Sequence, residues 1–396
     1  MCIPARSRCR LTHVHTRRAR FSLPLHFFTR VPGGPAGVSA AVSAAAASPT
    51  LAFLTPPAAP FPVEAGSFSP HGYQVLPLLQ SMMAKNDLDG EHYGKMKERE
   101  EREKRGRGAP GGARSRRKLD PSQHLSAAVP FSPTSAATAV AFFKNTPGHL
   151  LPLPAALLAR HARGLKHPEL AVASDGGDAL AKVAPLVARF GGTPRLVRAV
   201  EDGVRATQAS PAATACAQAA AAVLERVALL GEGVAEAITI SAGNPAVPGP
   251  GRAWLSAGLD AAASGDPLLG VAADGDDSAP AALVSAVAVA ASAGVGERYE
   301  AGVLAGAARG GAAAVTRAHL VGAWLAARAA VLAQEAGGRS DPARPDGAPP
   351  AEWRAKASKA LQLEAMVHVL LYQRGAVVPI AMAGDDVGGA EVVAEV

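Results

Sequence analysis

Cysteine and aromatic residues are scarce in this sequence. Three of its 396 residues are cysteine, and Cys2 and Cys9 lie near the N-terminal end, which leaves Cys216 alone in the rest of the chain. This excludes a disulfide framework and a paired-cysteine zinc site for the body of the protein, and it favours a reducing compartment. Aromatic residues make up 4% and all apolar residues 48%, so alanine and small aliphatic side chains supply most of the apolar surface. Because such residues favour closely packed helices over a sheet sandwich, we predict an all-α fold.

The sequence also lacks the short motifs of several large enzyme classes. It contains no GxxxxGK[ST] phosphate loop, no HExxH helix, no GxSxG nucleophile turn, and no GxGxxG after a strand pattern. The sequence therefore lacks the motif that a nucleotide triphosphatase, a zinc protease or a serine hydrolase of these classes would need. Four histidines have no carboxylate or cysteine at ligand spacing, and we interpret them as surface or packed residues: His161, His167, His319 and His368.

Acidic residues are missing from the N-terminal end, where the net positive charge is concentrated. Residues 1–63 contain seven arginines and no other charged residue, so the remaining chain is balanced, with 33 basic and 33 acidic residues. We predict a disordered leader over 1–61 that resembles a transit peptide for a chloroplast or mitochondrion. The alternative is a misassigned start, with the protein then cytoplasmic. Because the body is neutral, we expect no nucleic-acid partner.

Long apolar runs fit for a membrane are also absent. The uncharged stretch 31–63 is interrupted by proline and glycine, and the stretches 206–224 and 278–296 consist mostly of alanine, serine and glycine. These compositions are too weakly apolar for a bilayer core, and we expect no membrane partner. The charged stretch 95–118 has nearly balanced charge and no interleaved aromatics, which disfavours an RNA-binding arm.

Helical patterns recur along the rest of the chain. The spacing and the capping residues predict helices over 74–84, from Thr193 and Pro194 to Arg205, from Ser210 and Pro211 to Gly231, and near 281–293, 299–306 and 313–333. We expect the two helices that flank Ser210 to pack as a hairpin. Residues 62–336 then form one helical domain with linkers at 95–118 and 241–277, followed by a linker at 337–350, a last helix of the same domain at 351–374 and a tail at 375–396.

Two aspartates stand where the first strong helical pattern begins. Asp175 and Asp178 flank a pair of glycines, and paired acids of this kind can hold magnesium or assist glycosidic cleavage. Helix capping explains the same residues without a function, because acids are favourable at a helix N-terminus. The acidic cluster at 274–277 departs from the spacing of a calcium loop.

Five segments, in order, resemble motifs of the ADP-ribosylglycohydrolase family, and within it the branch of the jellyfish J-crystallins. Residues 66–74 resemble its T-G-S-F-S-x-Y-G-D-Q motif, and 166–190 its D-x-x-Q-x-D-A run. Residues 200–208 resemble its V-x-x-T-Q ending. The stretches 299–306 and 316–323 resemble Y-E-x-A-V and the late S-R…G-A, and 349–356 resembles I-P-x-x-W. The resemblance covers roughly 62–371.

The resemblance implies a single-domain orthogonal helical bundle, a pair of magnesium ions in a cleft, and ADP-ribose or an ADP-ribosylated molecule as partner. In the family the ions are held by an early G-D-D or G-D-Q motif and a late G-D-x-[DST] motif. Here Tyr73 stands in place of the early aspartate, residues 310–314 replace the late acidic run, and no opening helix is visible in 1–60. We therefore predict no metal ligand in this chain and leave the catalytic residues unassigned. The retained residues that we expect to bind the ligand are Ser67, Phe68, Gln74, Asp175, Asp178, Thr316 and Arg317.

Two functions follow from this resemblance. The first is a family member whose ancestral activity, the magnesium-assisted hydrolysis of ADP-ribosyl bonds, is weak or lost. The second is a non-catalytic, crystallin-like structural or ADP-ribose-binding protein. A faulty gene model that omits catalytic sequence would produce the same departures. Helix capping or a polar surface would explain the six polar residues of this set without a ligand. The sequence leaves the oligomeric state and the type of ADP-ribosyl linkage open.

Overall fold

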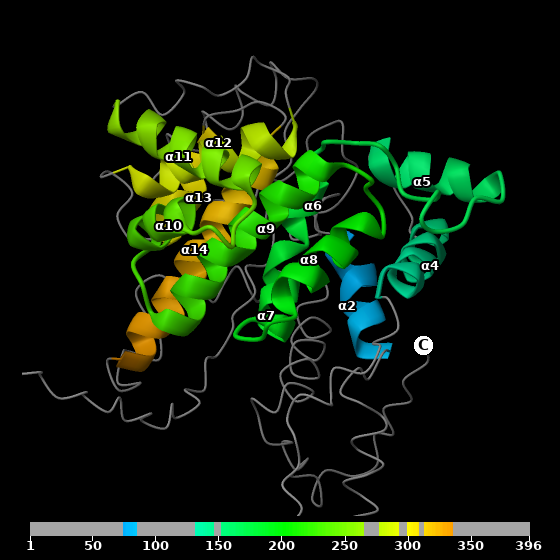
Figure 1. The fold of residues 1–396 in the computed structure, drawn as a ribbon, viewed down its shortest axis with the longest axis horizontal. Helices are drawn as coiled ribbons and strands as arrows, with labels where there is room; N and C mark the ends of the chain where they lie inside the picture. The colour runs from blue at the N-terminus through cyan, green and yellow to red at the C-terminus, as the bar shows by residue number, and fades with distance from the viewer. Residues whose placement is uncertain are drawn as a thin grey trace, which may run out of the picture.

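The computed structural model describes residues 74–84, 131–145, 152–264, 277–292, 299–308 and 313–335, and these residues form helices (Figure 1). No β-strand occurs among them; the extended contacts are the single bridges Val172–Gln208 and Gly176–Ser278. The predicted all-α fold is therefore confirmed. The elements, in chain order, are α2 (Val75–Ala84), α4 (Phe131–Lys144), α5 (Pro152–Ala162), α6 (Asp178–Ala181), α7 (Val183–Phe190), α8 (Leu196–Arg205), α9 (Pro211–Glu225), η3 (Arg226–Leu230), α10 (Val234–Gly243), α11 (Gly249–Ala263), α12 (Ala279–Ala291), α13 (Tyr299–Ala308) and α14 (Ala314–Glu335).

Helix α9 lies at the centre of the core. It packs against α6, α7, α8, α10, α11, α12 and α14. Ser210 caps its N-terminus by accepting a hydrogen bond from the Ala213 N–H, and Pro211 occupies the first helical position. After a π-helical turn, η3, the chain turns at Gly231 with φ 73°. Both predicted boundaries of this helix are confirmed.

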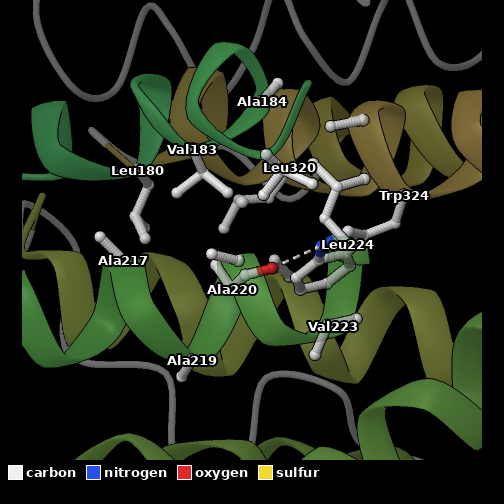
Figure 2. Packing of buried hydrophobic residues seen from close by; sticks show 14 of the residues in the cluster. Leu180, Val183, Ala184, Ala217, Ala219, Ala220, Val223, Leu224, Leu320 and Trp324 are labelled. Atoms are coloured by element: carbon white, nitrogen blue, oxygen red, sulfur yellow. Dashed lines mark hydrogen bonds between the residues drawn. The ribbon is translucent and has the colours of Figure 1, made fainter. Parts of the chain in front are cut away.

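A single large aromatic side chain fills the space between α9 and α14. Trp324 of α14 is fully buried, and its indole N–H donates to the Ala220 carbonyl of α9 at 3.3 Å. Figure 2 shows this hydrogen bond as a dashed line beside Ala220 and Leu224 of α9, with Leu180 of α6 and Val183 of α7 farther along the core. The described core therefore consists largely of alanine, valine and leucine, with Trp324 as its largest side chain.

The expected linker at 241–277 is wrong where the structure describes it, because residues 249–263 form helix α11. Two of its glycines are sites of close helix contact. A Cβ atom on Gly251 would lie 2.9 Å from the Ala215 carbonyl oxygen of α9, and one on Gly258 would lie 2.5 Å from the Val287 Cβ of α12. Glycine at these positions allows two helix backbones to approach closely.

A second correction concerns the start of α8. We expected Thr193 and Pro194 to begin this helix, but it begins at Leu196. The Thr193 hydroxyl donates to the Phe190 carbonyl at 2.6 Å, so this threonine closes the end of α7 and does not cap α8. The predicted packing of α8 against α9 is confirmed.

One stretch of the described chain, Pro211–Leu230, is long and apolar enough to cross a membrane, with a mean hydropathy of 1.4, although the sequence alone had suggested that this region is too weakly apolar. Buried residues make up 61% of that window, as expected for the central helix of a packed core.

Several predictions lie outside the described residues: the leader at 1–61, the linkers at 95–118 and 337–350, the helix at 351–374 and the tail at 375–396.

Candidate functional site

The segment between Ser174 and Asp178 is held by four helices that all begin beside it. At α9, the N-cap Ser210 donates its hydroxyl proton to Asp175 Oδ1. At α12, the Ala279 N–H donates to the Asp175 carbonyl at 2.6 Å, and the Gly177 N–H donates to the Asp277 carbonyl at 2.8 Å. These backbone bonds fix the segment against the first turn of α12.

The other two helices contact the second half of the segment. Gln74, directly before α2, donates its side-chain amide to Asp178 Oδ1. Thr316, in the first turn of α14, packs so closely on Gly177 that a Cβ atom there would lie 2.8 Å from the threonine hydroxyl oxygen. The structure therefore brings Gln74, Asp178 and Thr316 together around one turn of chain, although they are far apart in the sequence.

The remaining predicted site residues differ in their surroundings. Asp175 is exposed, whereas Asp178 is 6% exposed. Arg317 is buried, and its guanidinium donates to the Gly306 carbonyl at 2.6 Å and to the Ser285 hydroxyl at 3.5 Å. These contacts join α12, α13 and α14. Ser67 and Phe68, which we also expected at the site, lie outside the described residues.

Sequence reasoning missed two polar residues of this region. Lys182 lies at the end of α6, four residues after Asp178, and donates its ammonium to the Thr207 hydroxyl. Gln208 is fully buried and donates its side-chain amide to the Gly176 carbonyl at 3.0 Å and the Ser174 carbonyl at 3.3 Å. The signals were present, because Lys182 interrupts an apolar helical run and Thr207 with Gln208 ends the V-x-x-T-Q segment.

Burial determines the protonation of two groups near the segment. It lowers the pKa of Lys182 to about 8, against the opposing effect of the Asp178 charge. It also raises the pKa of the Cys216 thiol, and the negative charge of Asp175 adds to that increase. Cys216 is therefore a neutral thiol of the core at ordinary pH, and it is unsuited to act as a nucleophile.

The described residues do not fit the magnesium pair that the family resemblance implies. Nowhere in this part of the chain do three His, Cys, Asp or Glu side chains gather as a metal site requires. Magnesium needs an octahedral set of oxygen ligands, yet Asp178 receives an N–H donor from Gln74 and lies one turn from an ammonium. We derive no catalytic step through magnesium.

Comparison with known proteins identifies both the fold and the family of this chain. A solved structure of an ADP-ribosylglycohydrolase-related protein complex matches 79% of this chain and 84% of its own, with a TM-score of 0.51 and 17% identical residues, which shows a shared fold. No curated protein matches the chain. The family model for ADP-ribosylglycohydrolase matches residues 22–377, which is most of the sequence. The chain therefore belongs to the ADP-ribosylglycohydrolase family.

Proposed function

We propose that this chain binds an ADP-ribosyl group beside the 174–178 segment and hydrolyses its glycosidic bond weakly or not at all. The observation that carries the proposal is the meeting of α2, α9, α12 and α14 at their N-terminal ends around this segment. The N-terminal end of a helix carries partial positive charge and favours anions. Four such ends in one place suit the diphosphate of an ADP-ribosyl group.

The exposed edge of the segment supplies groups for the ribose. Asp175 and Asp277 are exposed, and their carboxylates can accept hydrogen bonds from sugar hydroxyl groups. Asp175 is held in place by Ser210 and by its own backbone bond to α12. A ligand that approaches from this edge meets a carboxylate that needs little further ordering.

The weak hydrolysis that we propose follows from the groups near the buried carboxylate. Cleavage of a glycosidic bond in the usual way takes an acid and a second carboxylate or a metal-bound water. Asp178 accepts a hydrogen bond from Gln74 and lies four residues from the ammonium of Lys182, and the Asp175 carboxylate accepts the Ser210 hydroxyl. These contacts support ligand binding better than proton transfer.

A calorimetric titration of the full chain with ADP-ribose tests the binding. Replacing Asp175→Asn should weaken binding about tenfold, because a hydrogen bond to a charged acceptor contributes about 1.5 kcal/mol. The matched control is Asp260→Asn, which changes an exposed acid on α11 and should leave the affinity unchanged. Equal losses in both variants, or no binding by the unaltered chain, would favour the crystallin-like structural alternative.

A release assay tests the second half of the proposal. ADP-ribosylated protein incubated with the chain and magnesium chloride should lose its ADP-ribose no faster than in buffer, or only slightly faster. Robust release that depends on magnesium would contradict weak hydrolysis, while leaving the binding proposal intact.

A further inference from the structure

The end of α5 and the loop that follows it carry a group of positive charges at the edge of the described fold (Figure 1). Arg160 stands in the last turn of α5, and Arg163 and Lys166 follow the end of the helix. The only acidic residue of this loop, residues 160–169, is Glu169. The loop therefore has an excess of positive charge, although basic and acidic residues are balanced over the chain beyond residue 63.

The 160–169 loop is held in one shape by its own hydrogen bonds. Gly164 has a φ of 81°, the left-handed conformation that often ends a helix, and its N–H donates to the His161 carbonyl at 2.8 Å. The Arg160 guanidinium donates to the Glu169 carbonyl from Nε at 3.0 Å and from Nη2 at 2.6 Å. This ties the far end of the loop to α5. A partner would meet charges on an ordered backbone, so little conformational entropy would be lost on binding.

The exposed cations of the loop are not neutralised by the described part of the chain. Arg163 and Lys166 are exposed, and the side chain of neither forms an ion pair or a hydrogen bond there. Helix α8 shows the opposite arrangement. Arg198 and Arg205 are also exposed, yet each forms an ion pair with an acid of the same helix, at 3.1 and 2.8 Å. The charges of the 160–169 loop are therefore available to another molecule.

Stabilisation of α5 explains only part of this group of charges. A cation near the C-terminal end of a helix interacts favourably with the partial negative charge there, which accounts for Arg160 and His161 in the last turn. That effect is confined to the end of the helix, whereas Lys166 lies four residues after Ala162, the last residue of α5. The Lys166 ammonium thus has neither a partner among the described contacts nor a helix end to stabilise.

We propose that the 160–169 loop docks an acidic peptide segment of a partner protein. The Arg163 guanidinium can bind one carboxylate through two parallel hydrogen bonds, and Lys166 can attract a second as a point charge. A nucleic acid fits less well, because the loop contains no Phe, Tyr or Trp on which a base could stack. A lipid surface also fits less well, because the exposed large apolar side chains of the described residues lie on α8, η3 and α10. The proposal does not depend on which ligand binds beside the 174–178 segment.

Fluorescence anisotropy of a labelled polyglutamate peptide, titrated with the full chain, tests this proposal. Arg163→Gln/Lys166→Gln should weaken binding about tenfold, because two surface ion pairs with the peptide are lost. The matched control is Arg198→Gln/Arg205→Gln, which removes the same charge from exposed positions of α8 and should change the affinity less than about twofold. Equal losses in both variants, or no binding by the unaltered chain, would overturn the proposal. An oligonucleotide of equal charge that binds more tightly than the peptide would overturn it as well.

A coupling experiment locates the bound peptide. Residues 1–63 carry seven arginines that can attract the same peptide, but they contain no lysine. A carbodiimide joins a peptide carboxylate to a lysine amine as an amide, and the water that is lost hydrates the carbodiimide to a urea. Mass spectrometry should find Lys166 coupled much more strongly than Lys144, an exposed lysine in the last turn of α4. Equal coupling at these two lysines would contradict docking at the 160–169 loop.

Discussion

The α9–α14 core and the 174–178 segment lie side by side, but they are held by different kinds of contact. Around α9, small side chains fill the space in bulk, and Trp324 is the large anchor between two helices. Along the 174–178 segment, single hydrogen bonds come from the N-terminal ends of α2, α9 and α12, each from a different part of the chain. The core should therefore respond to changes in volume, whereas the segment should respond to changes in charge and hydrogen bonding.

The largest expected effect is the loss of the core anchor. Trp324→Ala should lower the free energy of unfolding by about 4 kcal/mol, because it leaves a large cavity between α9 and α14. The matched control is Trp254→Ala, where the ring is only partly buried and the loss should be less than half as large. Denaturant unfolding followed by circular dichroism measures both. Equal losses would show that α14 is not anchored as the structure indicates.

The next effect tests the closeness of α11 and α12. Gly258→Ala places a methyl group against Val287 and should cost about 2 kcal/mol through overpacking. Gly243→Ala is the control: no atom lies within 4 Å of the added carbon, and the change should stabilise by roughly 0.5 kcal/mol. The same unfolding measurement applies. Gly258→Ala as stable as the unaltered chain would contradict the close approach.

A smaller effect is expected where the core meets the segment. Ser210→Ala removes the cap of α9 and the hydrogen bond to Asp175, and should cost about 1.5 kcal/mol. Ser256→Ala, on the exposed face of α11, should change stability by less than about 0.5 kcal/mol. Hydrogen exchange of the α9 amides reports the local part of the loss, and unchanged protection of the first turn in Ser210→Ala would contradict the capping role.

The smallest effect is a dependence on pH. Burial lowers the pKa of Lys182 from 10.5 to about 8, so between these values the unfolded chain holds more protons than the folded chain. Stability attributable to this group is therefore reduced below pH 8 and rises as the pH increases. Relative to Asp178→Asn/Lys182→Met, the unaltered chain should gain about 1 kcal/mol between pH 8 and pH 9. Parallel stability curves for the two proteins would contradict this shift.

The core was more predictable from the sequence than the segment. The serine–proline start and the glycine end of α9 depend on residues adjacent in the chain, so local patterns were enough to place them. Helix α11 was missed because its glycines suggest a loop when read locally. Their role becomes clear only from their close contacts with Ala215 and Val287, which lie on other helices. Composition alone does not distinguish a helix breaker from a site of helix contact.

The acids of the segment and one of their partners, Gln74, were predicted, but the other polar contacts of the region were not. Asp175, Asp178 and Gln74 were expected from the family resemblance, and the structure brings them to one place. Lys182 was not singled out, because one lysine in an apolar run has no meaning until the depth of the run is known. Its burial and its contact with Thr207 depend on the packing of α6 against α9, which no local pattern contains.

The most direct test of the account is the metal dependence of ligand binding. Calorimetric titration of the full chain with ADP-ribose, first with magnesium chloride and then with EDTA, should give saturable binding with the same Kd in both conditions, because the described residues bring no three possible metal ligands together. Binding that disappears with EDTA would show that a metal ion is needed at this site. That result would contradict the poor fit of the described residues to a metal pair and the binding by the 174–178 segment itself.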